Sequence, residues 1–433
     1  MIDIKNVNIA IIGVGYVGLP LAREFRKYFN VVAFDTDFKK VERLTSEEAA
    51  GKDDKEILKN KDLIFTNNQD KILEANCYIV TVPTPVTPSN EPDLTFLKAA
   101  CETVGSALKE DDVVIFESTV YPGTTEEFCI PILENTSRLK CKSEFSSVNC
   151  NGSGFDCGYS PERINPGDKD RNLADIIKIT SGNSKKSAKF IDQLYSKIIT
   201  AGTFSVASIK IAEAAKIIEN TQRDLNIALI NELSLLFKRL GIDTESVLKA
   251  AESKWNFQKF RPGLVGGHCI GVDPYYLTYK AKQVGFHPQL ILAGRAVNDS
   301  MGSNIATEIV QALGQRSALS DNIKVLILGV SFKENCPDVR NSKVIDIYNQ
   351  LKKFGCQIDV YDPVVDPQQV KYEHDIDLIS KIPEGTYDAI AICVSHDVFV
   401  NMEISDIKRF GKLNSLIYDV KYVFNPEDSD LRL

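Results

Sequence analysis

The sequence has few of the features that mark membrane proteins or nucleic-acid-binding proteins. No apolar run approaches the ~18 residues that a membrane-spanning helix needs. Acidic residues outnumber basic ones by 59 to 51, and the net charge of -8 leaves no basic face for nucleic acid or anionic lipid. We therefore expect no membrane partner and no nucleic-acid partner. An anionic ligand must instead be held locally, by helix N-termini and by single lysine or arginine residues.

The cysteines lack the spacing of a metal site. The chain has ten cysteines but no CxxC pair, and Cys141, Cys150 and Cys157 cluster without a neighbouring histidine, so we expect no metal. The first residues, MIDIKNVNIAIIG, contain no cationic segment ahead of an apolar one, as a secretory signal would. We expect a cytoplasmic protein whose cysteines are thiols, most of them small buried hydrophobic residues.

The N-terminal residues do contain the pattern of a dinucleotide-binding βαβ unit. Residues 8–12 predict a buried strand, residues 19–28 a helix, and residues 30–35 a second strand that ends at Asp35. The motif GVGYVG lies between the first strand and the helix. Its glycines would allow a tight turn and a close approach of a pyrophosphate, while Asp35 would bind ribose hydroxyls. The expected cofactor-binding residues of this loop are Gly13, Gly15, Tyr16, Val17 and Gly18.

The residue at the end of the second strand also bears on which cofactor binds. The Asp35 carboxylate would repel a 2'-phosphate, which favours NAD over NADP. Lys39 and Lys40 lie nearby, so NADP stays an alternative cofactor.

Further along, strands and helices alternate up to one long helix. Strand-like runs at 77–82 and 112–119 are separated by a helical stretch, which predicts a parallel sheet with helices between its strands. Residues 208–240 contain no glycine or proline and carry dense apolar residues at helical spacing. They predict a single long helix, closed by Gly241 and long enough to join two domains.

The C-terminal part repeats the pattern of the N-terminus. Residues 322–333 and 355–363 show the same strand, helix, strand order, so we expect a second Rossmann-like domain. The polar stretch 135–157 predicts a surface insertion. The expected fold is α/β, with two Rossmann-like domains that have parallel sheets and are joined by a long central helix.

Hydroxyl side chains follow two of the predicted strands. Thr84 lies in VPTP, and Ser118 and Thr119 lie in ESTVYPGTT. These positions fall at the carboxyl edge of the sheet, where open α/β folds bind ligands. The hydroxyls would either contact cofactor or water, or form ordinary turn hydrogen bonds, and spacing alone leaves both interpretations open.

Two further groups of residues have catalytic chemistry. Lys216 and Asn220 are four residues apart on the predicted long helix and share a face, so they could stabilise an oxyanion or simply form a polar helix surface. Cys269 follows two glycines and His268 and precedes Asp273 by four residues. Its thiolate would be a nucleophile toward an aldehyde, with His268 and Asp273 as proton carriers. The alternative, a buried structural thiol, stays open.

Seven motifs in order make the chain resemble the UDP-glucose/GDP-mannose dehydrogenase family between Ile9 and about Asn425. They are IGVGYVGLPLA, VPTP, ESTVYPGTT, GYSPERINPGD, AEAAKIIENTQRDLNIALINEL, FRPGLVGGHCIGVDPYYL and GVSFKENCPDVRNS. The resemblance implies a four-electron oxidation of a sugar-nucleotide primary alcohol to a carboxylate, with two NAD used in succession. It also implies a homodimer or higher homo-oligomer in which the long helix forms the dimer contact.

The resemblance further assigns roles to individual residues. Cys269 would capture the aldehyde as a thiohemiacetal, which a second hydride transfer converts to a thioester. Lys216 and Asn220 would hold the negative oxygen. Asp273, Thr119 and Glu162 would position or activate the water that hydrolyses the thioester. Where the UDP-glucose branch has a second glutamate after SPE, this chain reads SPERINPGD, so water handling would lean on Glu162 and Asp273.

The remaining implied contacts concern cofactor and substrate. Arg340 would reach the cofactor phosphates, which adds it to Thr84, Ser118 and Thr119 on the cofactor side. The implied substrate contacts are Glu162, Arg163, Lys216, Asn220, Arg223, Phe257, Arg261, Gly263 and Lys333. The implied domains are an NAD-binding domain at 1–205, a helical dimerisation region with catalytic residues at 206–318, and a UDP-sugar-binding domain at 319–433.

The motifs look most like those of the branch that acts on UDP-N-acetylhexosamines for capsule or O-antigen polysaccharides. We expect UDP-GlcNAc as substrate, with UDP-GalNAc a near alternative and UDP-ManNAc or UDP-glucose further ones. A two-electron dehydrogenase or epimerase, which would form one NADH per sugar or none, is a second enzymatic hypothesis. A non-catalytic NAD- or nucleotide-binding protein is the hypothesis from a different class.

Overall fold

The computed structural model of the chain describes residues 2–46, 63–142, 154–164, 172–267, 269–316 and 322–433. The chain divides into two compact units, one of Met1–Glu219 with Tyr275–Gly285 and the other of Asn220–Pro274 with Phe286–Leu433. Cys150, His268 and the middle of the 135–157 stretch lie outside the described residues. The expected division into three domains, with boundaries at 205 and 318, stays a prediction.

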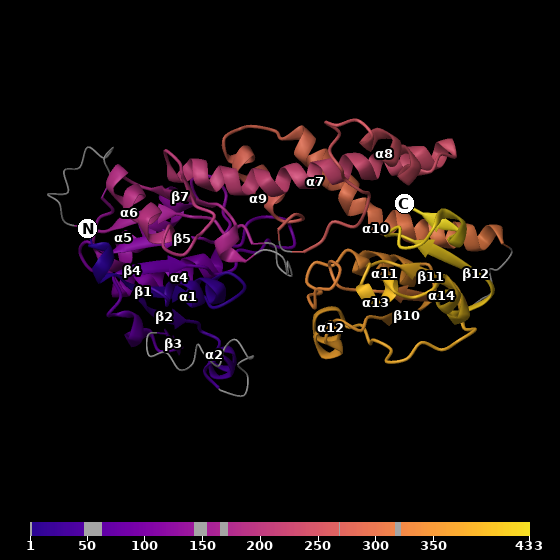
Figure 1. The fold of residues 1–433 in the computed structure, drawn as a ribbon, viewed down its shortest axis with the longest axis horizontal. Coiled ribbons are helices and arrows are strands. Elements are labelled where there is room, and N and C mark those ends of the chain that lie inside the picture. Colours follow the sequence, from indigo (N-terminus) through magenta and orange to yellow (C-terminus); the bar gives the residue numbers. More distant parts are fainter. Residues whose placement is uncertain (1, 47–62, 143–153, 165–171, 268, 317–321) are drawn as a thin grey trace. The chain divides into compact units, whose positions relative to one another are not determined.

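The first unit contains an eight-stranded sheet in the order β3-β2-β1-β4-β5-β6-β7-β8 (Figure 1). Neighbouring strands are parallel except for the antiparallel pair β6 and β7. The strands are β1 (Asn8–Ile12), β2 (Asn30–Phe34), β3 (Leu63–Thr66), β4 (Cys77–Val80), β5 (Val113–Phe116), β6 (Asp156–Tyr159), β7 (Lys178–Gly182) and β8 (Thr203–Ser205). The helices that accompany them are α1 (Gly18–Phe25), α2 (Phe38–Thr45), α4 (Thr95–Ala107), α5 (Ile130–Ser137) and α6 (Lys185–Tyr195).

Apolar side chains on both faces explain why the central strands of this sheet are hydrophobic throughout. Strand β1 sends Ala10 and Ile12 into one core, which α4 and α5 close, and Ile9 and Ile11 into another, which α1 and α6 close. Strands β4 and β5 alternate in the same way. Successive side chains of a strand point to opposite faces, so a parallel sheet covered on both sides needs continuous apolar runs.

The predicted long helix is confirmed as α7 (Ile209–Leu240), which has 32 residues. It ends as expected at Gly241, whose φ of 68° suits a residue without a side chain. The amides of Gly241 and Ile242 donate to the carbonyls of Lys238 and Phe237, which satisfies the last turn. The boundary between the two units falls within α7.

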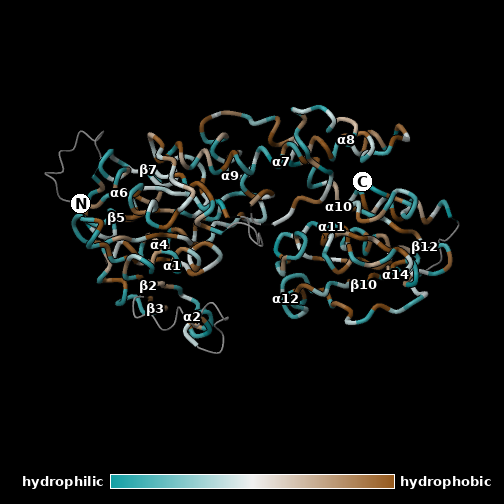
Figure 2. Tube along the Cα trace, viewed as in Figure 1, coloured by the Kyte–Doolittle hydropathy of each residue, from teal (hydrophilic) through white to brown (hydrophobic). Residues whose placement is uncertain are grey.

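Three more helices complete the central part of the chain. They are α8 (Thr244–Glu252), α9 (Asp273–Gln283) and α10 (Gln289–Gln315). Hydrophobic and hydrophilic residues alternate along the helices in Figure 2, as they do in helices that place one face on a core.

The second unit contains a parallel five-stranded sheet in the order β10-β9-β11-β12-β13. Its strands are β9 (Lys324–Leu328), β10 (Gln357–Tyr361), β11 (Tyr387–Ile392), β12 (Gly411–Asp419) and β13 (Leu431–Arg432), and its helices are α11 (Val344–Lys353), α12 (Pro367–His374), α13 (Asp397–Val400) and α14 (Ile404–Phe410). The α/β fold with two Rossmann-like sheets and a long central helix is thereby confirmed. One difference is the antiparallel strand β7, which makes the N-terminal sheet mixed.

Each sheet has a point where the chain reverses the direction in which strands are added. In the first unit the chain runs from β1 outward to β3 and then returns to β4 on the other side of β1. In the second it runs from β9 to β10 and then to β11 on the other side of β9. Ligands of open α/β sheets bind in the crevice at the carboxyl ends of the strands at such points. The loops after β1, β4, β9 and β11 are therefore the places to look for binding residues.

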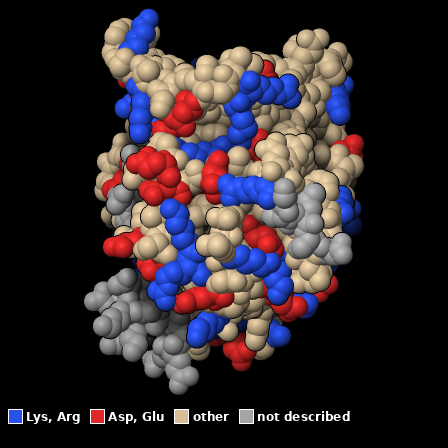
Figure 3. Space-filling model, turned by 90° about the vertical axis from the view of Figure 1, so that its right-hand side faces the viewer, with Lys and Arg blue, Asp and Glu red and all other residues tan. Residues whose placement is uncertain are grey.

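Among the described residues, no helix combines the length and apolarity required for crossing a membrane. The described part of the chain also contains no group of three or more His, Cys, Asp or Glu side chains that could hold a metal ion. On the face shown in Figure 3, basic and acidic side chains are interspersed among uncharged ones.

Candidate active site

The glycines of the loop after β1 differ in whether the turn could accommodate a side chain in their place. Gly13 has a φ of 95°, and a Cβ at Gly18 would lie 2.0 Å from the Gly13 carbonyl oxygen, so both are needed for the turn itself. At Gly15, no described atom lies within 4 Å of the position that a Cβ would take. The turn thus leaves open space beside Gly15, ahead of the N-terminus of α1. Tyr16, the next residue, is largely exposed.

Asp35 follows β2 and is held by hydrogen bonds from the same loop. Its Oδ2 accepts from the Val14 amide at 2.8 Å and from Lys40 Nζ at 2.9 Å, and its Oδ1 accepts from the Asp37 amide at 3.0 Å. Burial alone would raise the pKa of this carboxyl, but these hydrogen bonds and the Lys40 charge outweigh burial and lower it. Asp35 is therefore a fixed carboxylate beside the glycine loop.

The hydroxyls after β4 and β5 tie the two loops together. Ser118 Oγ donates to the Val82 carbonyl at 2.6 Å, and Thr84 Oγ1 donates to the Thr119 carbonyl at 2.6 Å. Each hydroxyl keeps its oxygen as an acceptor, so turn formation and ligand binding are compatible. Thr119 itself is partly exposed at the same edge of the sheet.

Glu162 belongs to a buried cluster of charges that the sequence reasoning missed. Lys178 Nζ lies 2.6 Å from Glu117 Oε2 and 3.4 Å from Glu162 Oε2, and the Tyr195 hydroxyl donates to Glu117. Glu162 Oε1 accepts from two backbone amides that follow it. The cluster lies at the carboxyl edge of the sheet, because β7 runs antiparallel to β6 and brings its first residue, Lys178, to that edge.

The electrostatics of this cluster follow from its composition, which is two carboxylates and one ammonium. Burial raises the pKa of Glu117 to about 7; the Lys178 charge opposes this shift and the Glu162 charge adds to it. Burial disfavours the ammonium of Lys178, but the two carboxylates outweigh burial and raise its pKa. A signal was present in the sequence, since Lys178 interrupts the apolar run IIKIT and a buried lysine requires a partner.

Asn220, Asp273 and Cys269 are brought together within the second unit. Asn220 Nδ2 donates to Asp273 Oδ2 at 2.6 Å, and both side chains are buried. The Asp273 amide donates to the Cys269 carbonyl at 2.8 Å, so one turn links the cysteine to the first residue of α9. The side chain of Cys269 is half-buried. Lys216 is buried on α7, one turn before Asn220 and on the same face.

The glycines before Cys269 allow a protein loop to approach closely. A Cβ at Gly266 would lie 2.5 Å from the Asn341 carbonyl oxygen, and one at Gly267 would lie 2.7 Å from the Phe332 ring. The described contacts of both glycines are with the loop that follows β9, so these glycines seat the cysteine segment on the C-terminal sheet.

The residues expected to contact substrate are spread over the second unit and the edge of the first. Arg223 Nη1 lies 3.4 Å from Asn220 Oδ1, which adds a cation to the Asn220 group. Gly263 is buried and exchanges hydrogen bonds with the Asn231 side chain, and Phe257 is half-buried. Arg163, in the first unit, pairs with Glu219 at 2.8 Å.

The other expected cationic contacts already face acidic or aromatic side chains. Arg261 pairs with Glu245 at 2.7 Å and with Glu252. Arg340 makes two hydrogen bonds to Asp338, at 2.7 and 3.0 Å. The half-buried Lys333 lies with its Nζ 5.7 Å from the centre of the Phe332 ring. Ligand phosphates would therefore compete with existing partners at Arg261 and Arg340.

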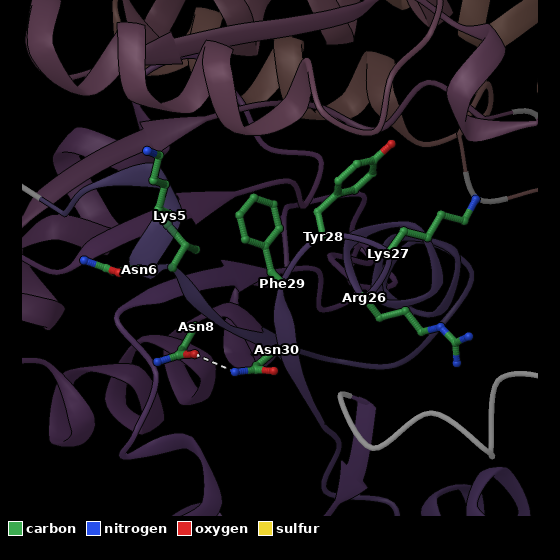
Figure 4. Close-up of a pocket in the computed structure, with 9 residues that line it drawn as sticks. Lys5, Asn6, Asn8, Arg26, Lys27, Tyr28, Phe29 and Asn30 are labelled. Carbon is green, nitrogen blue, oxygen red and sulfur yellow. Dashed lines mark hydrogen bonds between the residues drawn. The ribbon is translucent and has the colours of Figure 1, made fainter.

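A hollow of about 460 Å³ lies at the other end of the N-terminal sheet (Figure 4). It is lined by residues around the first residues of β1 and β2, where Asn30 Nδ2 donates to Asn8 Oδ1 at 3.2 Å. None of the expected site residues lines it. Because ligands of this fold bind at the carboxyl ends of strands, we do not assign the active site to this hollow.

Comparison with known proteins shows that the chain is similar to sugar-nucleotide dehydrogenases. Models of the UDP-glucose/GDP-mannose dehydrogenase family match residues 7–199 (NAD binding domain), 210–300 (central domain) and 326–426 (UDP binding domain). The UDP-N-acetyl-D-glucosamine 6-dehydrogenase of Pseudomonas aeruginosa is 49% identical over 99% of this chain and 100% of its own length. That of Salmonella typhi is 50% identical over 100% of both. The solved structure of a UDP-D-ManNAc dehydrogenase from Pyrococcus horikoshii matches with a TM-score of 0.85 and 29% identity, over 98% of both chains.

Proposed function

Because this chain belongs to the UDP-glucose/GDP-mannose dehydrogenase family, we propose that it oxidises the C6 alcohol of UDP-N-acetyl-D-glucosamine to a carboxylate with NAD. The observation that carries the proposal is the identity of 49% and 50%, along the whole chain, to two relatives named as UDP-N-acetyl-D-glucosamine 6-dehydrogenases. Polysaccharide biosynthesis for a capsule or O-antigen is the pathway that we expect to use the product.

The residues at the carboxyl edge of the N-terminal sheet fit NAD. The open space beside Gly15 suits a pyrophosphate at the N-terminus of α1, and the fixed carboxylate of Asp35 suits the hydroxyls of an adenosine ribose. Lys40 forms an ion pair with Asp35. We therefore assign selection against a 2'-phosphate to the Asp35 carboxylate. When bound, NAD accepts the hydride in each oxidation, so two NAD are consumed per sugar.

Cys269 is the proposed nucleophile between the two oxidations. Its thiolate would add to the C6 aldehyde and form a C–S bond, and loss of the second hydride from C6 would leave a thioester. Addition of water and cleavage of the C–S bond would then release the carboxylate and return the thiolate. Covalent capture explains how one enzyme could oxidise the same carbon twice without releasing the aldehyde.

The other residues assigned to the reaction have complementary roles. We assign Lys216 and Asn220 to the negative oxygen of the intermediates, because an ammonium and an amide N–H both donate to an oxyanion. The Asn220 amide also donates to Asp273, which fixes the orientation of the amide. We assign Asp273, Glu162 and Thr119 to the water that hydrolyses the thioester, since a carboxylate can accept its proton.

The nucleotide part of the substrate is assigned to the second unit. The family model over 326–426 is that of a UDP binding domain, and the loop after β9 holds Lys333 at the switch point of the sheet. We propose Lys333, Phe257, Gly263, Arg261, Arg223 and Arg163 as substrate contacts and Arg340 as a contact to the cofactor phosphates.

We also propose that α7 carries the contact between two copies of the chain. Ile211, Ile218, Leu229, Leu236 and Leu240 are each 48–60% exposed on this helix. Their spacings of 7, 11, 7 and 4 residues place them along one side of a helix with 3.6 residues per turn. An exposed apolar stripe of this kind is typical of an interface.

A cytoplasmic location is part of the same proposal. No disulfide joins any two of the nine described cysteines, which suits a reducing compartment. Cell fractionation with an antibody against the chain would test it: the protein should remain with the cytoplasmic fraction, and recovery from the secreted or periplasmic fraction would contradict the proposal.

A panel of sugar nucleotides tests the proposed substrate. Purified protein with NAD should oxidise UDP-GlcNAc with the highest kcat/KM, ahead of UDP-GalNAc, UDP-ManNAc, UDP-glucose and GDP-mannose. A higher kcat/KM for UDP-ManNAc, the substrate in the name of the Pyrococcus horikoshii relative, would contradict UDP-GlcNAc as the substrate. Absence of NADH formation with every sugar, together with NAD binding, would favour a non-catalytic nucleotide-binding protein.

A further inference from the structure

The loop that follows β9 is held by a buried imidazole. His396 follows β11 and is completely buried. Its Nδ1 accepts the Asn335 amide at 2.9 Å, so the proton of the neutral ring resides on Nε2. Nε2 lies 3.1 Å from Asp362 Oδ2 and 3.2 Å from Ser331 Oγ. The ring therefore contacts both ends of the segment 331–335.

Asp362, at the end of β10, holds the same segment from the other side of β9. Its Oδ2 accepts the Val330 and Ser331 amides at 2.7 and 3.1 Å, and its Oδ1 accepts the Val364 amide. Burial would raise the pKa of this carboxyl, but the hydrogen bond from His396 and those from the backbone amides outweigh burial and lower it. Asp362 is thus a carboxylate that accepts hydrogen bonds from one imidazole and three backbone amides.

The arrangement excludes a nucleophilic serine. Ser331 Oγ donates to the Lys333 carbonyl at 2.8 Å, and its contact with His396 is through the same nitrogen that faces Asp362. In a Ser-His-Asp triad the serine and the aspartate occupy opposite nitrogens of the imidazole. The role that remains is structural, because His396, Asp362 and Ser331 direct most of their hydrogen bonds to residues 330–335.

We propose that His396 and Asp362 are positioning residues for substrate binding, which hold the segment 331–335 so that Lys333 can meet the diphosphate of the UDP-sugar. This inference rests on the proposed function. Three strands that meet at a switch point each contribute one member: β9 leads to the segment, β10 to Asp362 and β11 to His396. A half-buried lysine in a loop segment needs such support, because losing it would cost the side-chain order that a phosphate contact requires.

Calorimetric titration with UDP, in the full-length protein, tests the inference without catalysis. His396→Leu should weaken UDP binding roughly tenfold, whereas NAD binding should change less than twofold. His396→Gln should recover most of the loss, since its amide can accept from Asn335 and donate to Asp362. In kinetics, His396→Leu should raise KM for the sugar nucleotide more than it lowers kcat.

A double-mutant cycle with Lys333→Met separates positioning from general damage. If His396 acts through Lys333, the double variant should bind UDP about as weakly as Lys333→Met alone. Tyr387→Phe is the matched control, because it removes a partly buried hydrogen bond to Asp359 in the same sheet without touching the segment. Its UDP affinity should equal that of the wild type.

The outcomes distinguish the inference from the proposed function. UDP affinity of His396→Leu within twofold of the wild type, or losses in the two single variants that add in full, would overturn the inference. A wild-type protein that binds no UDP and oxidises no UDP-sugar would instead overturn the proposed function on which it rests.

Discussion

Lys178 connects two carboxylates that follow neighbouring strands, and it is 2% exposed. Lys178→Met would leave Glu117 and Glu162 buried side by side without a cation. We expect it to lower the free energy of unfolding by about 3–5 kcal/mol, the usual cost of breaking a buried ion pair. Urea unfolding followed by circular dichroism measures the change.

Lys210 provides a matched control for this prediction. It also bridges two carboxylates, Glu126 and Glu127, but all three side chains are exposed. Lys210→Met should cost only about 0–1 kcal/mol, because solvent already screens these ion pairs. Equal losses in the two variants would contradict the special role assigned to the Lys178 cluster.

Glu117 makes part of the stability depend on pH. Burial raises its pKa to about 7 from an ordinary value of 4.5, so the folded chain binds this proton more tightly than the unfolded chain does. Its contribution to the free energy of unfolding is therefore full below pH 4.5 and is lost as the pH rises through 7.

Glu117→Gln should reduce that slope. Urea unfolding at pH 5.5 and 8 should show a smaller difference in the variant than in the wild type. Some slope should remain, because burial also raises the pKa of Asp112 and of Glu213 to about 7. An unchanged slope would show that Glu117 does not titrate in this range.

At the scale of elements, the glycine loop contains one glycine that we expect to be needed for NAD binding, Gly15, and another that is needed for folding, Gly18. Gly15→Val should keep the melting temperature near that of the wild type, because no described atom lies within 4 Å of the new Cβ, but it should weaken NAD binding at least tenfold. Gly18→Ala should lower the melting temperature, because its Cβ would clash with the Gly13 carbonyl. Calorimetric titration measures the NAD affinity, and thermal unfolding measures the melting temperature. An unchanged NAD affinity in Gly15→Val would show that the glycine loop is not part of the NAD-binding site.

Helix α7 offers a second prediction at this scale. Leu229→Lys combined with Leu236→Lys should convert a dimer to a monomer, since each charge would be buried in the proposed interface. Leu413→Lys is the control, because Leu413 is 95% exposed on β12 and outside the stripe. Light scattering after size exclusion measures the mass; a double variant that keeps the wild-type mass would rule out this face as the contact.

Some structural features could be predicted from the sequence and others could not, for a physical reason. The βαβ unit and α7 were predictable because periodicity, glycine placement and helix termination are local properties of the chain. The Lys178 cluster was not, because its members are brought together only by the reversed direction of β7, which the local pattern does not encode. The packing of Gly266 and Gly267 against the loop after β9 likewise depends on tertiary contacts.

At the scale of the whole molecule, the chain combines an NAD-binding sheet, a UDP-binding sheet and a cysteine segment linked to α9. The fold and the family could be predicted from seven motifs spread along the chain. The catalytic roles of Cys269, Lys216, Asn220, Asp273, Thr119 and Glu162 stay proposals. They share one consequence, which is that oxidation proceeds past the aldehyde on the enzyme.

The number of NADH formed per UDP-GlcNAc consumed tests that consequence most directly. We expect two NADH per sugar and UDP-N-acetylglucosaminuronate as the product, measured by absorbance at the NADH band and by mass spectrometry. Cys269→Ala should form no uronate, whereas Cys141→Ala, which alters another half-buried thiol, should keep the wild-type ratio. A ratio of one with release of the aldehyde, or full uronate formation by Cys269→Ala, would contradict the account.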